Sequence, residues 1–291
     1  MFPGVLLPLL AAVTVAVAVT TVHKKMPPKV ASRMLTVALA VVAGAAVPTM
    51  WLVSFGYLGH LPVFGDGFSW CARMFGIHAR IPHWAGLPAV GISSIGLFRT
   101  WRVFMLHRRI RHDQPGSVEI AGHEAVFAFT LPGRGGHVVL SSGLVELLDD
   151  DEQSVVLAHE HAHARHRHDR YLLIGQLAAA NIPFLRPLSS RLQFSLERWA
   201  DEEAVAACHG DRPFVAYTLG KVALRTVTPV GALSFGGLGV TARVAALLAP
   251  APTRPSAARL LGMWGAIAMT AVLAGFQVHH LARLVTAMCP G

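Results

Sequence analysis

Two histidines and a glutamate in residues 155–163 have the types and the spacing to hydrolyse a peptide bond with the help of a metal ion. The run reads VVLAHEHAH and contains an HExxH string at 159–163. On a helix, positions i and i+4 share one face, so His159 and His163 can direct both imidazoles at one zinc ion. Glu160 is then placed to take a proton from the attacking water as general base. The alternative is a basic, histidine-rich helix that binds no metal.

A catalytic zinc ion needs a third protein ligand, which this string does not supply. The best candidate is Glu197, in the downstream run FSLERWADEEAVAAC. Asp201 follows at i+4 on the same helix face, where it can accept the N–H of a ligating histidine. The alternative is an ordinary solvated acidic face, because Glu202 and Glu203 follow directly.

Three further histidines lie close to the string. His166 would lie about 10 Å along the helix axis from His159, which is too far to share the same ion. We expect His161 and His168 on the surface, as a pH-sensitive or adventitious metal-binding fringe. No glycine occurs between His163 and His168, which excludes the metzincin arrangement with its glycine turn before a third histidine.

The elements that must position these residues are a helix and a small sheet. The acidic run at 149–152 predicts the N-cap and first turn of the helix that carries the HExxH string. Turn-forming residues at 132–136 separate short runs of β-formers, which predict a small sheet from Val118–Ile120, Ala125–Thr130 and Val138–Leu140. A peptide substrate is expected to add as a strand to the sheet edge near 125–141.

The composition predicts a mainly α-helical membrane protein. Hydrophobic residues make up 53% of the 291 residues and charged residues only 14%, which is too apolar for a soluble domain of this length. Four segments are predicted to span a bilayer, namely 2–22, 34–56, 84–106 and 260–282. Arg99 and Arg102 interrupt the third, where they can snorkel to the inner surface. A cleaved signal peptide is the alternative for the first, although its lysines follow the apolar core.

Short basic loops give the orientation. Lys24, Lys25, Lys29 and Arg33 crowd the first connection, and five arginines lie at 99–111. By the positive-inside rule both regions are cytoplasmic, so the catalytic segment is expected inside and both chain ends outside. The net charge of +9 then reflects this topology and contact with anionic lipid. A nucleic-acid surface is the rival explanation, but no recognition motif supports direct nucleic-acid binding.

Three regions follow from these patterns. Residues 1–110 form an N-terminal transmembrane region, 111–257 a cytoplasmic zinc-binding domain, and 258–291 a C-terminal transmembrane helix with a short outer tail. Cys71 and Cys289 both fall on the predicted outer face, where they either form a disulfide or stay unpaired.

The chain resembles a known group of enzymes in three runs: VVLSSGLVELLDDDEQSVVLAHEHAHARHRHD, ERWADEEAVAAC and GVTARVAALLAP. They are similar to the gluzincin integral-membrane zinc metallopeptidases, over about residues 118–250. The group includes the prenyl-protein (CAAX-type) and HtpX-type proteases and the antirepressor peptidases related to the beta-lactam sensor-transducers. The resemblance implies an α+β zinc protease domain in which Glu197 is the third Zn²⁺ ligand and Asp201 supports a ligating histidine. Arg243, in the last run, is a candidate contact for the substrate or its oxyanion.

The layout of predicted spans looks most like the sensor-transducer branch. That resemblance implies an endopeptidase of the bacterial plasma membrane that cleaves a cytoplasmic protein, such as a winged-helix transcriptional repressor in a signal-transduction pathway. The chain departs from that branch because no penicillin-binding domain follows the last span. It departs from the prenyl proteases because no His-Pro precedes Arg243. The alternatives are a quality-control or prenyl-protein protease and a non-catalytic membrane sensor that keeps the fold. The sequence specifies no oligomeric state.

Overall fold

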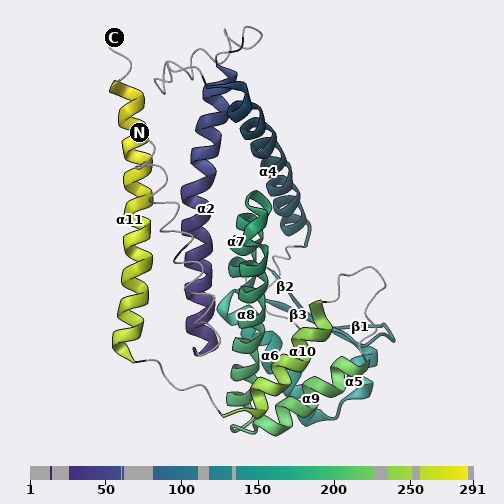
Figure 1. Ribbon diagram of the computed structural model, residues 1–291. Helices are drawn as coiled ribbons and strands as arrows, with labels where there is room; N and C mark the ends of the chain where they lie inside the picture. Colours follow the sequence, from purple (N-terminus) through teal and green to yellow (C-terminus); the bar gives the residue numbers. More distant parts are fainter. Residues whose placement is uncertain are drawn as a thin grey trace.

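The computed structural model describes residue 14 and residues 26–59, 61, 81–110, 118–132, 136–225, 235–250 and 256–287. Three long helices extend from one end of a domain that contains both helices and strands, called the mixed domain below (Figure 1). Apart from residue 14, the predicted span 2–22 lies outside the described residues. So do Cys71 and Cys289, so their pairing stays a prediction.

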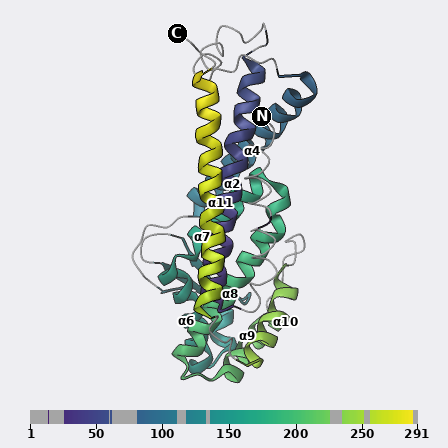
Figure 2. The ribbon, with the colours of Figure 1, turned by 60° about the vertical axis from the view of Figure 1, so that its left-hand side comes forward.

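The long helices are α2 (Pro28–Leu58), α4 (His83–Ile110) and α11 (Ala257–Ala287). Helix α2 packs against both of the others, as the turned view also shows (Figure 2). Among the described helices, α2 is the one that is long and apolar enough to cross a membrane. The second half of α4 carries four arginines, and the apolar stretch described in α11 is short, Leu260–Val272. The four predicted spans are therefore not confirmed.

The mixed domain contains the predicted small sheet. Its strands are β1 (Val118–Ala121), β2 (Ala128–Leu131) and β3 (His137–Ser141), in the order β1-β3-β2. Strand β1 runs parallel to β3, and β2 runs antiparallel to it. All five residues of β3 are buried, which suits a central strand of apolar β-formers. Strand β2 lies at the edge and begins three residues later than the sequence pattern predicts.

Helices fill the rest of the domain and carry the predicted site residues. They are α5 (Ser142–Leu147), α6 (Asp150–His166), α7 (His168–Asn181), a 3-10 turn (Pro183–Leu185), α8 (Arg186–Ala207), α9 (Arg212–Arg225) and α10 (Phe235–Leu248). The HExxH string lies on α6, and Glu197 and Asp201 lie on α8, as predicted. Helices α6 and α8 pack against each other, so the two halves of the predicted site meet.

Two local features define the ends of α6. At its start, the Asp149 carboxylate accepts the backbone N–H of Glu152, and the Glu152 carboxylate accepts that of Asp149. This reciprocal cap confirms the predicted N-cap. At its end, Arg167 adopts a left-handed backbone conformation with φ of 52°. The chain therefore turns sharply at Arg167 and enters α7 at once, which directs His168 back toward α6.

The largest apolar core joins the first half of α2 to α7 and α8. It contains Met34, Leu35 and Leu39 of α2 and Leu192 and Leu196 of α8, none more than 1% exposed. Helix α8 carries Glu197 immediately after Leu196, so the long helix α2 and one wall of the predicted site are packed into the same core.

The cap of α6 leads to a stability prediction. Replacing Asp149 with Ala leaves the N–H of Glu152 without its partner, and we expect the free energy of unfolding to fall by about 1 kcal/mol. The midpoint of thermal unfolding of the full chain in detergent measures the effect. Ser154→Ala, at an exposed position of the same helix, is the matched control. Equal midpoints for the two variants would show that the cap does not stabilise α6.

Candidate metal centre

Three side chains converge between α6 and α8 with donor atoms suited to a cation. The Nε2 atoms of His159 and His163 lie 3.2 Å apart. The Glu197 carboxylate places one oxygen 3.6 Å from His159 Nε2 and the other 3.7 Å from His163 Nε2. A tetrahedron with zinc-to-nitrogen distances near 2.0 Å has edges of about 3.3 Å. The spacing of the donors therefore fits a zinc ion bound by the three residues that the sequence predicts.

Asp201 holds His159 from the side away from this cluster. Its Oδ1 lies 3.1 Å from His159 Nδ1, so the imidazole can donate Nδ1–H to the carboxylate and keep Nε2 free as a donor to a metal. The contact matches the role that the sequence predicts for Asp201. The carboxylate is almost completely buried, which makes the interaction strong and its partners necessary.

Arg243, on α10, binds both carboxylates of α8. Its Nε and Nη2 donate to the two oxygens of Asp201 at 2.8 and 2.6 Å. Its Nη1 lies 3.0 Å from Glu197 Oε2. Arg243 thus reaches the predicted site, where its contacts orient Asp201 and Glu197. A contact with the substrate or its oxyanion stays a prediction.

His168 is placed to accept the Nδ1–H of His163, as Asp201 is placed to accept that of His159. The Nδ1 atoms of His168 and His163 lie 2.9 Å apart. If His163 keeps Nε2 free for a metal, its Nδ1 carries the proton and donates to Nδ1 of His168. The prediction that His168 is a surface residue is wrong, because the side chain is 1% exposed and lies between the rings of His166, Tyr171 and Trp199.

Charges around the cluster shift the pKa values in opposite directions. Burial disfavours the charged form of His159, but hydrogen bonds with Asp201 and Glu197 outweigh burial and raise its pKa to about 10. Burial also opposes the ionisation of Glu197, yet His159, His163 and Arg243 hold its pKa well below the usual range. Burial and the neighbouring His163 lower the pKa of His168 to about 3. Without a metal, a proton on His159 therefore balances carboxylate charge, and a cation must displace it.

Glu160, the predicted general base, lies on α6 beside the cluster and is buried. The hydroxyl of Thr130, on strand β2, lies 2.7 Å from Glu160 Oε2 and 2.9 Å from the Glu160 backbone carbonyl. The hydroxyl has one proton and donates to one of these two oxygens at a time, so the contact joins β2 to α6 at Glu160. Nothing in the spacing of the sequence pointed to Thr130, because the contact depends on how the sheet packs on α6.

Two cavities border the cluster. One, of about 380 Å³, is lined by Ala128–Leu131 of β2 as well as by Glu160 and the three candidate ligands. The other, of about 250 Å³, lies toward α9 and α10 and is lined largely by apolar side chains, including Val155, Val156, Val215, Leu219 and Val222. The cluster is therefore bordered by one cavity along β2 and by a more apolar one beside α9.

The remaining histidines of α6 do not join the cluster. His161 is exposed, as predicted. His166 Nε2 lies 2.9 Å from Glu203 Oε1, and its ring stacks on Trp199. The expectation that His166 does not share the ion therefore agrees with its contacts.

The donor set leads to a prediction about metal content. We expect the purified full chain to hold about one zinc ion, and His163→Ala or Glu197→Ala to lose most of it, because two ligands cannot hold the ion tightly. Elemental analysis of protein in detergent measures the ratio. His161→Ala, an exposed histidine on the same helix, should keep the wild-type content. A wild-type content near zero, or one unaffected by either variant, would contradict the assignment.

The His163–His168 contact leads to a second prediction. His168→Phe keeps a ring of similar size but removes the acceptor for His163 Nδ1–H. We expect zinc affinity to fall by about 10- to 100-fold, the usual cost of losing such a partner. Competition with a chelator of known affinity measures it. His166→Phe, the same change at the adjacent stacked ring, is the control and should keep the wild-type affinity; equal losses in both variants would refute a specific role for His168.

Comparison with known proteins agrees with this geometry. The family described as Peptidase family M48 matches residues 105–222, a segment that contains the sheet, α6, α7 and α8. No curated protein and no solved structure matches the chain. Members of family M48 are zinc-dependent metallopeptidases, so the match supports a metallopeptidase built around the helices that carry the candidate ligands.

Proposed function

We propose that this protein is a zinc-dependent endopeptidase of the membrane, with His159, His163 and Glu197 as the metal ligands and Glu160 as the catalytic base. The single observation that carries the proposal is the convergence of the three donors at tetrahedral spacing, with a buried carboxylate from Glu160 beside them. His159, His163 and Glu197 would hold a zinc ion, which would supply Lewis acidity for the hydrolysis of a peptide bond.

The work of the protein's own residues is proton transfer and orientation. Glu160 accepts a proton from the attacking water and returns it to the leaving amine. The hydroxyl of Thr130 can donate to the Glu160 carboxylate and restrict its position. Asp201 and His168 hold the two imidazoles, and Arg243 keeps Asp201 and Glu197 in place. Both the proton transfer by Glu160 and the binding of the metal therefore use side chains that hydrogen bonds or ion pairs hold in position.

We propose that the substrate binds as an extended strand beside β2. Strand β2 pairs with β3 alone among the described strands, so its other edge is free to hydrogen-bond to a peptide backbone. Four consecutive β2 residues line the cavity that also contains Glu160. The apolar cavity toward α9 is suited to one hydrophobic substrate side chain next to the cleaved bond.

The proposed location is the bacterial plasma membrane, with a multi-pass chain and a cytoplasmic active site. The support is the apolar helix α2 and the concentration of arginines in the inner half of α4. We propose the three-part division at 1–110, 111–257 and 258–291 with it. The proposed substrate is a cytoplasmic protein. The resemblance to antirepressor peptidases makes a transcriptional repressor of a signalling pathway the first candidate. Quality control or prenyl-protein processing is the alternative within the enzyme class.

A test separates an enzyme from a sensor that binds without catalysis. Glu160→Gln removes the base but none of the three ligands, so we expect zinc content to stay at the wild-type level while cleavage falls by about 10²- to 10⁴-fold. Cleavage of an unfolded model protein is measured with the full chain in lipid vesicles. In cells, the measurement is which proteins accumulate in the strain that carries the variant. Glu146→Gln, on the short helix α5, is the matched control for the change itself. Normal cleavage by Glu160→Gln protein would end the proposal.

A further inference from the structure

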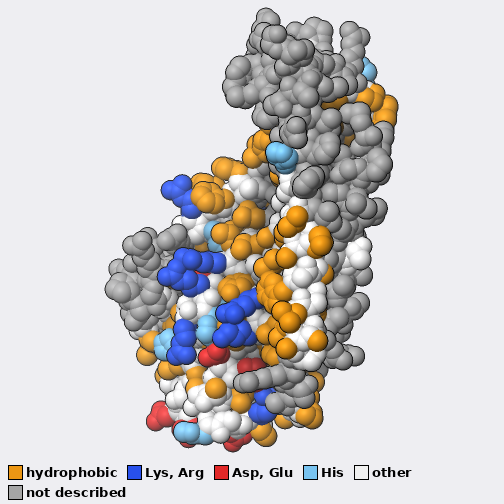
Figure 3. Space-filling view, turned by 90° about the vertical axis from the view of Figure 1, so that its left-hand side faces the viewer, with side chains coloured by type: hydrophobic (Ala, Val, Ile, Leu, Met, Phe, Trp, Pro, Cys, Tyr) orange, Lys and Arg blue, Asp and Glu red, His pale blue; other side chains and the backbone are white. Residues whose placement is uncertain are grey.

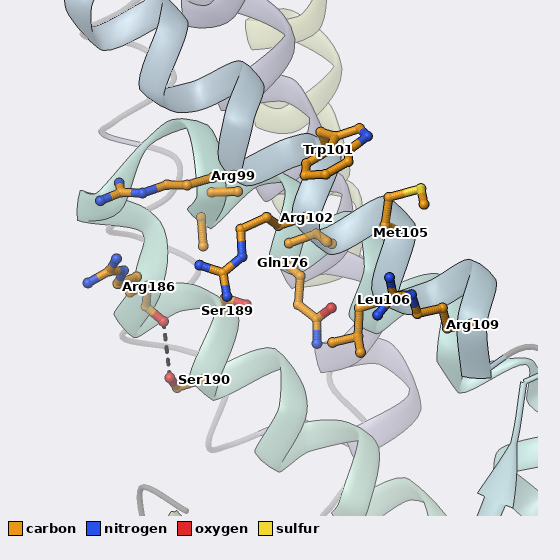
Figure 4. A pocket seen from close by; sticks show the side chains of 13 residues that line it. Arg99, Trp101, Arg102, Met105, Leu106, Arg109, Gln176, Arg186, Ser189 and Ser190 are labelled. Atoms are coloured by element: carbon orange, nitrogen blue, oxygen red, sulfur yellow. Dashed lines mark hydrogen bonds between the residues drawn. The ribbon is translucent and has the colours of Figure 1, made fainter.

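One cavity of the described molecule lies apart from the metal centre. It has a volume of about 740 Å³ and lies between the second half of α4, the end of α7 and the start of α8. Figure 4 shows it from close by. The cavity is open to the outside, and its walls combine apolar side chains with four guanidinium groups.

The charge of this cavity has one sign. Arg99, Arg102, Arg109 and Arg186 line it, and no acidic residue does. None of the four forms an ion pair with a carboxylate within the part of the chain that the structure describes. In Figure 4, Arg102 points toward Ser189, and the side chains of Arg99 and Arg186 extend to the left of it. The lining is therefore positively charged, and a phosphate has both the charge and the acceptor oxygens that guanidinium groups bind.

The apolar part of the cavity continues onto the surface of α4. Residues 83–98 of that helix contain no Asp, Glu, Lys or Arg and extend over about 24 Å. Phe98 and Trp101 are 56% and 55% exposed, and Phe184, two residues before Arg186, is 94% exposed. A patch of large apolar side chains with this much exposed surface is typical of a site that contacts a membrane or another apolar partner. The arginines therefore lie where a long apolar surface ends.

Charged side chains are also distributed unevenly over the face of the molecule seen in Figure 3. Figure 3 shows Lys and Arg side chains gathered across the middle of the face seen there, and acidic side chains mostly toward the end farthest from the long helices. A basic band next to apolar helices is the arrangement that faces the anionic surface of a cytoplasmic leaflet.

We propose that this cavity, formed by α4, α7 and α8, binds the phosphate headgroup of an anionic phospholipid through Arg99, Arg102 and Arg186. The acyl chains of that lipid lie along the exposed apolar face of α4, beside Phe98 and Trp101. The inference rests on the proposed membrane location and on no feature of the peptidase chemistry. An acidic protein segment would satisfy the arginines but would leave the apolar face uncovered, which is why a lipid fits better.

The site lies next to the metal centre without being part of it. Gln176, on α7, lines both this cavity and the larger cavity beside Glu160. Its side-chain oxygen lies 3.1 Å from His107 Nε2, which ties α7 to the end of α4. A lipid held between α4 and α8 would therefore brace one wall of the cleft in which the substrate is proposed to bind.

Lipid retention by the full chain tests the proposal. The protein is purified in a neutral detergent doped with either phosphatidylglycerol or phosphatidylcholine, and the lipid that stays bound is counted by native mass spectrometry. We expect about one phosphatidylglycerol per wild-type chain and no comparable retention of phosphatidylcholine. The triple variant Arg99→Gln, Arg102→Gln, Arg186→Gln should bind phosphatidylglycerol at least about tenfold more weakly.

The matched control removes the same number of charges elsewhere. Arg165→Gln, Arg170→Gln and Arg225→Gln together change three exposed arginines outside the cavity and should keep the lipid. Equal loss in both triple variants, or equal retention of the two lipids, would overturn the proposal. The proposal would also be overturned if the cavity variant lost binding of polyglutamate but kept its lipid. That result would identify the cavity as a docking groove for an acidic protein segment.

Two readouts keep this result separate from the peptidase proposal. Zinc content shows that the cavity variant is folded, because the metal centre uses none of its arginines. Lipid retention is measured without a substrate, so an inactive enzyme would leave it unchanged. Release of the wild-type chain from cell membranes by alkaline carbonate would contradict the membrane location and the lipid site with it, and would leave the metal centre standing.

Discussion

The structure depends most on the buried ion pair between Arg243 and Asp201. It joins α10 to α8, and Asp201 in turn holds His159 on α6, so three helices from distant parts of the sequence are fixed relative to one another. Asp201 is 3% exposed, and losing one partner of a pair this buried costs roughly 3–5 kcal/mol because the other charge is left uncompensated. The ion pair therefore sets the position of the candidate ligands before any metal binds.

The charge balance of the centre is consistent with a divalent cation. The carboxylates of Glu160, Glu197 and Asp201 face a single guanidinium, that of Arg243, among the described residues around the cluster. Two negative charges are left after this pairing, and a divalent cation would offset them. The two imidazoles are supported unequally, since a carboxylate backs His159 and a neutral imidazole backs His163. His159 is thus the more electron-rich of the two ligands, and it is also the one bound to the network of Asp201 and Arg243.

Local rules were sufficient to predict most of the elements. The i, i+4 spacing of His159 and His163, and of Glu197 and Asp201, needs only helical geometry, and the structure places both pairs on helices that pack together. The capping run at 149–152 and the three β-rich runs are likewise local signals. That the chain is largely helical with one small sheet follows from them.

The failures of prediction have physical reasons. The expected surface position of His168 is wrong because the left-handed Arg167 turns the chain and buries the ring against His163, a turn that no residue spacing indicates. Thr130 was missed because its contact with Glu160 crosses from a strand to a helix 30 residues away. The segment 84–106 does form helix, but its arginines line a cavity shared with α7 and α8, so hydropathy alone did not describe its surroundings.

The shared core of α2 and α8 has a mechanical consequence. Met34, Leu35 and Leu39 interlock with Leu192 and Leu196, and the next residue on α8 supplies the Glu197 carboxylate. Packed interiors transmit displacement because they are barely compressible. A displacement of the first half of α2 would therefore pass through this core to the helix that carries Glu197.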